Sequence, residues 1–197
     1  MAGVRRLDWK EDGPLRSSIT TVLASLLAGA CGHGTPGGAP APQDPRVTSG
    51  LEQVRAATRP YFSVDSAAAA GYAREVRDCL VHEHHGAMGY HHSNPRFADA
   101  KVELDRPEIL LYERMPDGKY RLNGVEFIVP YRFWPRDSIP PTVMGQTMKR
   151  EDNLKFFYLH AWVWTPNPDG LFSDFHPDVQ CAEGTSKIFR PYTAPPS

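Results

Sequence analysis

Apolar and polar positions divide the chain into an amino-terminal part without a folding pattern and a longer part with helix and strand patterns. Residues 19–30 form one short apolar run, and residues 32–50 are rich in proline and glycine without apolar periodicity. Such a stretch buries too little apolar surface to order itself, so we expect a disordered tether over residues 32–50. Regular apolar spacing begins at Leu51, which predicts a single globular domain over residues 51–197.

Two helices are predicted at the start of this domain. The first runs from Leu51 to Arg59 and is stopped by Pro60. The second follows an N-cap at Ser63 or Asp65 and covers residues 66–80. Its apolar side chains recur at three- and four-residue steps, namely Ala69, Tyr72, Val76, Cys79 and Leu80. This pattern places a cysteine at the buried end of a helix.

Strand patterns follow. Residues 109–113 and 120–131 flank a Met-Pro-Asp-Gly turn and predict a β-hairpin. The second strand is apolar on both faces, which is typical of a central strand. One predicted face carries Leu122, Glu126 and Ile128, and the other carries Val125, Phe127 and Val129.

Residues 156–165 give the strongest strand pattern in the chain. Alternation predicts one shared face for Phe156, Tyr158, His160, Trp162 and Trp164. Residues 142–154 are polar and predict a loop or a short helix, and the remainder predicts irregular chain packed back on the sheet. The expected fold class is therefore α+β: short amino-terminal helices, then an antiparallel sheet or partly closed barrel.

Composition excludes one class of function. The formal net charge of -1 provides no basic field, so we expect no nucleic-acid partner. A serine-nucleophile elbow, a phosphate-binding loop, a dinucleotide fingerprint and a Cys-x-x-Cys pair are all missing from the sequence. The sequence therefore names no reaction and leaves open whether the chain is an enzyme.

The amino terminus has the pattern of an export signal. The apolar run at residues 19–30 is too short to span a bilayer, which takes ~20 residues, but it suits a signal-peptide core. Its end, LLAGAC, resembles a bacterial lipoprotein signal. That resemblance implies a signal peptide over residues 1–31 that ends at a lipidated Cys31, and a periplasmic or membrane-anchored protein. Plain cleavage after Ala30 and a buried core helix are the alternatives.

Two cysteines remain in the domain once the leader is removed. Cys79 and Cys181 would meet an oxidising compartment after export, where a disulfide is the default state. A thiol ligand for a metal near the histidines is the alternative.

Five of the eight histidines lie between Cys79 and Pro95, in the stretch CLVHEHHGAMGYHHSNP. With the blocks PEILLYE, GVEFIVP and LHAWVWTPNPDGLFSDFHPDVQC, this stretch resembles a family of uncharacterised secreted bacterial proteins, many of them lipoproteins. The resemblance covers nearly the whole domain and implies that His91, Asn94, Glu126 and His160 are family-pattern positions. It implies no role for His84, His85, His92 or His176, and no activity.

Three polar residues stand in or beside apolar strands. Glu126 and His160 interrupt strand patterns, and His91 follows Gly89, whose missing side chain allows close approach of backbone or ligand. A buried carboxylate must be paired, hydrogen-bonded or protonated. Two histidines and one carboxylate are the ligand set of non-haem iron sites and of catalytic zinc sites. We therefore predict that these three residues converge on a transition metal (Zn, Cu or Fe), with His82, Asn94 and Tyr158 as accessory residues.

The same residues allow other readings. A buried Glu–His network without a cofactor would satisfy the polar groups equally well, and so would a metal-free catalytic pair. The expected function is an exported envelope protein with a His/Glu metal site. The alternative is a structural or small-molecule-binding periplasmic lipoprotein, in which aromatic residues line an apolar pocket. The sequence does not indicate an oligomeric state.

Overall fold

The computed structural model describes residues 44–74, 79–182 and 186–188. Three short helical elements precede the strands: α1 (Pro45–Thr58), the 3-10 helix η1 (Arg59–Phe62) and α2 (Val64–Ala69). The predicted signal peptide and its predicted lipidation site, Cys31, lie outside the described residues. Within them, none of the helices has the length and apolar character needed to cross a membrane.

Helix α1 begins earlier than the sequence pattern indicated. The Asp44 side chain accepts a hydrogen bond from the Arg46 N–H and caps the helix, and Pro45 occupies the first turn. Val47, Leu51 and Val54 form its buried stripe. Residues 45–50, expected in the tether, are thus helical, because Val47 begins the apolar face that Leu51 continues.

Helix α2 is much shorter than the predicted helix over residues 66–80. Its expected N-cap is confirmed, since the Ser63 hydroxyl accepts from the Ser66 N–H. It ends at Ala69 because Gly71 adopts a positive φ of 100° and turns the chain. Strands β1 (Ala73–Arg74) and β2 (Cys79–His82) follow, so Cys79 lies on a strand.

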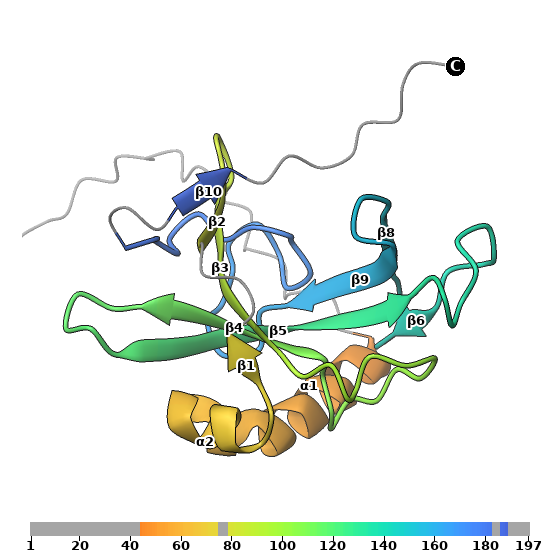
Figure 1. Ribbon diagram of the computed structural model, residues 1–197, viewed down its shortest axis with the longest axis horizontal. Coiled ribbons are helices and arrows are strands. Elements are labelled where there is room, and N and C mark those ends of the chain that lie inside the picture. Colours follow the sequence, from red (N-terminus) through yellow and green to blue (C-terminus); the bar gives the residue numbers. More distant parts are fainter. Residues whose placement is uncertain (1–43, 75–78, 183–185, 189–197) are drawn as a thin grey trace, which may run out of the picture. The chain divides into compact units, whose positions relative to one another are not determined.

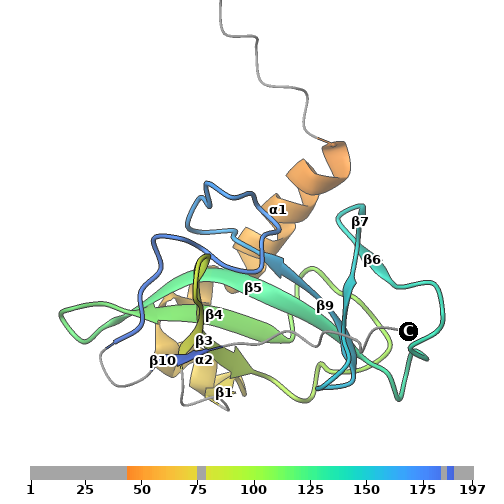
Figure 2. The same ribbon diagram turned by 90° about the horizontal axis from the view of Figure 1, so that it is seen from above.

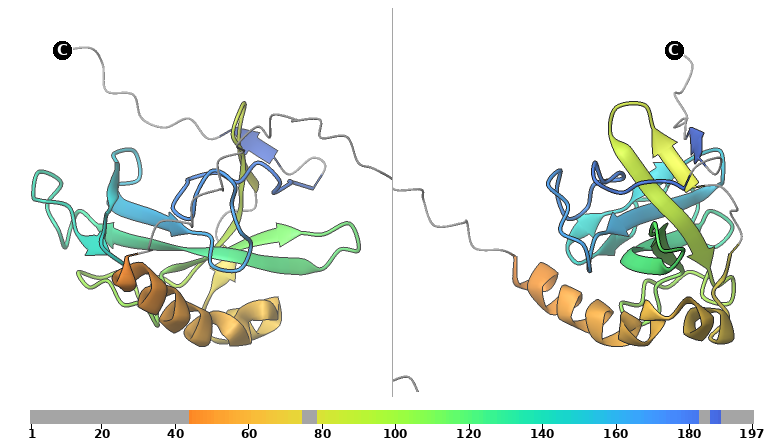
Figure 3. Two further views of the ribbon diagram at one scale, coloured as in Figure 1. Left: turned by 180° about the vertical axis from the view of Figure 1, so that it is seen from behind. Right: turned by 90° about the vertical axis from the view of Figure 1, so that its left-hand side faces the viewer.

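The remaining strands complete a curled, mainly antiparallel sheet, which confirms the expected α+β class with a partly closed barrel. They are β3 (Gly86–Ser93), β4 (Ile109–Arg114), β5 (Tyr120–Pro130), β8 (Lys149–Glu151), β9 (Phe156–Ala161) and β10 (Ser186–Ile188). Their order is β10-β2-β3-β4-β5-β9-β8, with β1 paired to β3 and β10 parallel to β2. In Figures 1 and 3 the helices cover one side of the sheet, and β2 and β10 rise on the other.

The predicted hairpin is β4–β5, and β5 is central, as expected, between β4 and β9. Val125, Phe127 and Val129 are fully buried and pack in one core with α1. Leu122 belongs to this same core, although simple alternation placed it on the Glu126 face. The reason is an extra residue at Asn123: Leu111 pairs with Gly124, and the next residue of β4 pairs with Leu122.

Strand β9 stops at Ala161, four residues before the predicted end. Trp162 then packs against Ala87 and Val179, whereas Trp164 lies beside Phe62 and donates its indole N–H to the Thr58 hydroxyl. The shared face predicted for these two tryptophans is therefore wrong. Residues 142–154, expected as a loop or short helix, contain β8 and the small separate hairpin β6 (Thr142–Val143)–β7 (Gln146–Thr147), which is labelled in Figure 2.

The chain after β9 is irregular and folds back over the sheet, as expected. A disulfide joins Cys79 in β2 to Cys181, with Cα atoms 5.5 Å apart, and confirms the predicted pair over a thiol ligand. It links the carboxyl-terminal segment to β2, the first strand of the β2–β3 hairpin. A disulfide is compatible with an exported protein.

Candidate metal centre

The sheet register brings the three predicted ligands onto one face. Glu126 on β5 lies directly opposite His160 on β9 and Ile109 on β4. Ile109 in turn lies opposite Ser93 on β3, and His91 is two residues before Ser93. Residues paired in this way, or two apart on a strand, point to the same side of a sheet. All three ligands therefore face away from the core beneath α1.

The three side chains meet at one point. One ligand atom from each of His91, Glu126 and His160 lies within 4.8 Å of the others. The Nε2 atoms of His91 and His160 lie 3.5 Å and 3.7 Å from the same carboxylate oxygen, Oε2 of Glu126. The residues are 7%, 1% and 5% exposed for His91, His160 and Glu126. The predicted convergence is confirmed, and this buried group can hold a metal ion.

The convergence leaves hydrogen-bonding capacity unused. Both imidazole–carboxylate distances exceed the 2.7–3.2 Å of ordinary hydrogen bonds. Among the described residues, Nε2 of His160, which faces the Glu126 carboxylate, has no hydrogen-bond partner. Buried polar atoms are normally satisfied, so such a cluster requires an explanation, and an ion is one.

Electrostatics at the site favour a neutral imidazole and oppose a bare carboxylate. Burial, reinforced by the neighbouring His160, lowers the pKa of His91 to about 3, so its ring is neutral at physiological pH. The backbone carbonyl of Gly89 partly opposes this lowering of the His91 pKa, although Nδ1 of His91 has no hydrogen-bond partner among the described residues. Burial raises the pKa of Glu126, and only His160 works against that rise. A cation would compensate the Glu126 charge.

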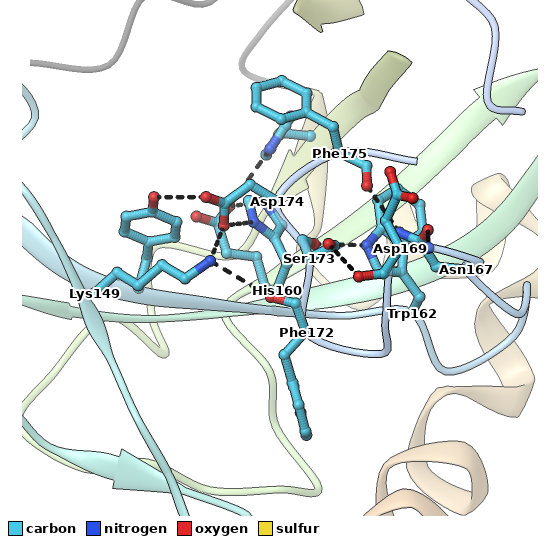
Figure 4. Close-up of polar contacts among 12 residues, drawn as sticks. Lys149, His160, Trp162, Asn167, Asp169, Phe172, Ser173, Asp174 and Phe175 are labelled. Atoms are coloured by element: carbon cyan, nitrogen blue, oxygen red, sulfur yellow. Dashed lines mark hydrogen bonds and ion pairs between the residues drawn. The ribbon is translucent and has the colours of Figure 1, made fainter. Parts of the chain in front are cut away.

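Asp174 contacts the His160 ring at Nδ1, the nitrogen that does not face Glu126. Its Oδ1 lies 3.5 Å from His160 Nδ1 and accepts from the Lys149 ammonium at 2.6 Å, while its Oδ2 accepts from the Tyr158 hydroxyl at 3.3 Å (Figure 4). Burial disfavours the charge on Asp174, but His160 and then Lys149 hold its pKa down at about 2. A carboxylate on Nδ1 orients an imidazole so that Nε2 faces a metal.

The segment that presents Asp174 is fixed by its own contacts (Figure 4). The predicted turn at Asn167 forms: the Asn167 carboxamide oxygen accepts from the Asp169 N–H, and the Gly170 N–H bonds to the Asn167 carbonyl. The Trp162 indole N–H donates to the Ser173 carbonyl at 2.7 Å. These bonds place the next residue, Asp174, over His160.

A cavity of about 430 Å³ opens onto the three ligands. Buried residues form its inner end, including His91, Ser93 and Glu126. Exposed residues form its outer end, including Arg132, Leu154 and Lys155. The volume falls in the range of about 300–1,000 Å³ that is typical of small-molecule sites.

The predicted accessory residues have different positions. Tyr158 lines the cavity and packs edge-on against His160, with ring centroids 5.7 Å apart. Asn94 also lines it, but its side chain is used structurally, donating to the Ala70 carbonyl and accepting from the Arg96 N–H. His82 does not line this cavity. Its ring stacks near His84, His85 and Phe175 beside a second, shallower pocket.

The histidines expected to have no role lie away from the cluster. His84 and His85 are exposed on the β2–β3 turn. His92 is buried on the other side of β3 against Tyr112 and Tyr120. His176 packs on Trp162, and its two ring nitrogens bond to the Pro166 carbonyl and the Asp178 N–H.

Sequence reasoning missed several residues of the site. Asp174 stood in a segment predicted to be irregular, and Ser93 stood in the histidine-rich stretch, for which no strand was predicted. Glu108, 2% exposed, also lines the cavity and accepts from the Ile128 N–H at 3.0 Å. Burial raises the pKa of Glu108 to about 8. Its position just before the apolar run Ile109–Leu111 was the one available signal.

Fold and site together define an α+β half-barrel domain with a buried His₂–Glu group at the inner end of a cavity. Comparison with protein-family models, with curated proteins and with solved structures gives no match to this chain. The family resemblance of the sequence blocks therefore stays a prediction.

Proposed function

We propose that this chain is an exported envelope protein that binds one transition-metal ion through His91, Glu126 and His160 and presents it to a small molecule. The ion would have three protein ligands and a coordination position open to the cavity. Such an arrangement is typical of reactive sites, because structural metal sites close all of their positions with protein ligands.

The observation that carries the proposal is the meeting of three buried ligand atoms within 4.8 Å, with imidazole–carboxylate distances of 3.5 Å and 3.7 Å that are longer than ordinary hydrogen bonds. A hydrogen-bond network would bring the His160 ring and the Glu126 carboxylate to about 2.7–3.2 Å, not 3.7 Å. Spacing wider than a hydrogen bond suits donors that share an ion, since metal–ligand bonds of ~2.0–2.2 Å hold their donor atoms apart.

The surroundings support the same proposal. Asp174 behind His160 matches the carboxylate–histidine–metal arrangement of known sites. The donor set of two imidazoles and one carboxylate suits zinc, iron or copper. When bound, such an ion supplies a Lewis acid that polarises an oxygen atom or activates water. Tyr158 and Asp174, linked by a hydrogen bond, are placed to hold a proton beside it.

Export is the second part of the proposal. It is supported by the short apolar run before Cys31 in the sequence and by the Cys79–Cys181 disulfide. A lipid on Cys31 would attach the domain to a membrane through residues 32–43.

Elemental analysis tests the metal assignment. The untagged mature chain, exported to an oxidising compartment, should carry about one zinc, iron or copper ion, or take up one equivalent after chelation. The near-isosteric variants Glu126→Gln and His160→Gln should each weaken metal binding by more than roughly tenfold.

A matched control is His84→Gln, which removes an exposed histidine outside the cluster. It should retain the full metal content. If the folded wild type and Glu126→Gln bind each of the three metals with the same affinity, the result would instead support a buried Glu–His network.

A further inference from the structure

The cavity face of the sheet is a ladder that runs from the ligands to the surface. Across β5 and β9 the successive pairs are Glu126 with His160, Ile128 with Tyr158, and Pro130 with Phe156. All six residues line the cavity. Four residues of strand span roughly 14 Å, so the outer end lies about that far from the ligands. Between the two ends the wall is largely apolar.

Two cations stand at the outer end of this ladder. Arg132 follows Pro130 by two residues, and Lys155 precedes Phe156; the Lys155 carbonyl accepts from the Tyr131 N–H, which keeps the two segments together. In the described part of the chain neither cation forms an ion pair. Lys155 acts on Asp152 at longer range, but Arg136 and Tyr131 already bind that carboxylate.

An unused polar group stands at the inner end. Ser93 is 8% exposed and lines the cavity, and its hydroxyl oxygen is buried without a hydrogen-bond partner among the described residues. It shares the cross-strand row of Glu126 and His160. The Arg132 guanidinium lies over the Phe133 ring, 4.6 Å from its centroid, and no described carboxylate pairs with it. A cavity with apolar walls and two cations without ion-pair partners at its mouth matches a particular kind of molecule.

We propose that the cavity binds an amphiphilic organic anion, such as a medium-chain carboxylate. The anionic group pairs with Arg132 and Lys155, and the apolar body lies along Ile128 and Phe156 in the direction of the metal site. The inference deepens the proposed function and rests on it for the inner end only, because the cations and the apolar wall do not depend on a metal.

Charge supports this choice over a neutral or cationic ligand. A divalent ion bound by one carboxylate and two neutral imidazoles leaves a net positive charge at the inner end. Two carboxylates at the cavity wall are buried and already accept from backbone N–H groups: Glu151 from Asn153 and Leu154, and Glu108 from Ile128. An anion at the mouth therefore meets cations without a strong competing carboxylate.

Isothermal titration calorimetry with octanoate, 1-octanol and octylamine tests the inference on the full-length chain with and without zinc. Octanoate should bind roughly tenfold more tightly than octanol, because one charge-assisted contact is worth about that much. Octylamine should not compete. The double variant Arg132→Gln/Lys155→Gln should abolish the preference for octanoate and leave octanol binding unchanged, while Ile128→Trp should fill the cavity and weaken both.

The control double variant is Arg114→Gln/Lys119→Gln, which removes two cations from the β4–β5 hairpin, outside the cavity. It should behave as wild type. Equal affinity for octanoate and octanol, or octanoate binding unaffected by Arg132→Gln/Lys155→Gln or by Ile128→Trp, overturns the inference. If the protein binds octanoate but takes up no metal, the ligand proposal is supported and the metal proposal is contradicted. If it takes up metal but does not bind octanoate, the metal proposal is supported and the ligand proposal is contradicted.

Discussion

Replacing Glu126 with glutamine should have opposite effects on stability in the absence and the presence of metal. The carboxylate is 5% exposed and lies 3.5 Å and 3.7 Å from its nearest imidazole nitrogens. Without an ion it is a buried charge without a close partner, which is costly. Glutamine keeps the shape and removes the charge.

The protonation equilibrium limits the size of this effect. A buried carboxylate destabilises the fold by no more than the free energy of protonating it. From the ordinary pKa of 4.5, that limit at pH 7 is about 3.4 kcal/mol, at ~1.36 kcal/mol per unit. The buried amide also loses hydration, so we expect a net stabilisation of metal-free Glu126→Gln by about 1–2 kcal/mol.

Metal should reverse the order. An ion that binds only the folded state at ~100 times its dissociation constant adds about 2.7 kcal/mol to the wild type. The variant, which lacks the anionic ligand, should gain little. Wild type would then equal or exceed Glu126→Gln in stability.

Urea denaturation at pH 7, with chelator or with zinc, measures both arms. Glu52→Gln on the exposed side of α1 is the control, and its stability should change by less than about 0.5 kcal/mol in either condition. If metal-free Glu126→Gln were less stable than wild type by more than about 1 kcal/mol, Glu126 would be part of a favourable hydrogen-bond network and our reasoning would be refuted.

Four further outcomes are expected. First, the pKa of His91 is about 3 in the folded protein and 6.5 ordinarily, so the unfolded chain takes up this proton first as the pH falls. The metal-free protein should therefore lose stability between pH 6.5 and pH 3, by at most about 1.4 kcal/mol per pH unit. Acid titration of His91→Gln should show a shallower loss of stability. Second, Asp174→Asn should weaken zinc binding about 10- to 100-fold in a chelator competition; an unchanged affinity would contradict its orienting role. Third, Cys79→Ala/Cys181→Ala should lower the free energy of unfolding in urea by about 2–5 kcal/mol; no loss would mean that this tie is unimportant. Fourth, intact mass should show a mature chain that begins at Cys31, and a cytoplasmic species that retains Met1 would contradict export.

Local patterns determined the elements whose partners are close in the chain. The β4–β5 hairpin follows from its turn residues, and the central position of β5 follows from its two apolar faces. The disulfide followed from having two domain cysteines. The three ligands could be named because each is polar where the pattern is apolar, and burial makes such a residue costly unless a partner compensates it.

Tertiary structure decided where those residues point and what surrounds them. A single extra residue at Asn123 moved Leu122 into the core while Glu126 stayed on the cavity face, and no local pattern signals a bulge that depends on the neighbouring strand. Helix α2 ended at Ala69, before the turn at Gly71, and the following segment paired with the sheet instead, because strand pairing outweighs helical periodicity.

The meeting of the three ligands depends mainly on the order of the strands in the sheet. His91, Glu126 and His160 belong to three strands, and only the register through β4 and β9 sets them on one face. Asp174 lies beside His160 because the irregular segment that contains it is fixed by the turn at Asn167. Contacts between residues distant in the chain depend on packing rather than on spacing, which is why the sequence supplied the ligands and the fold supplied the pocket.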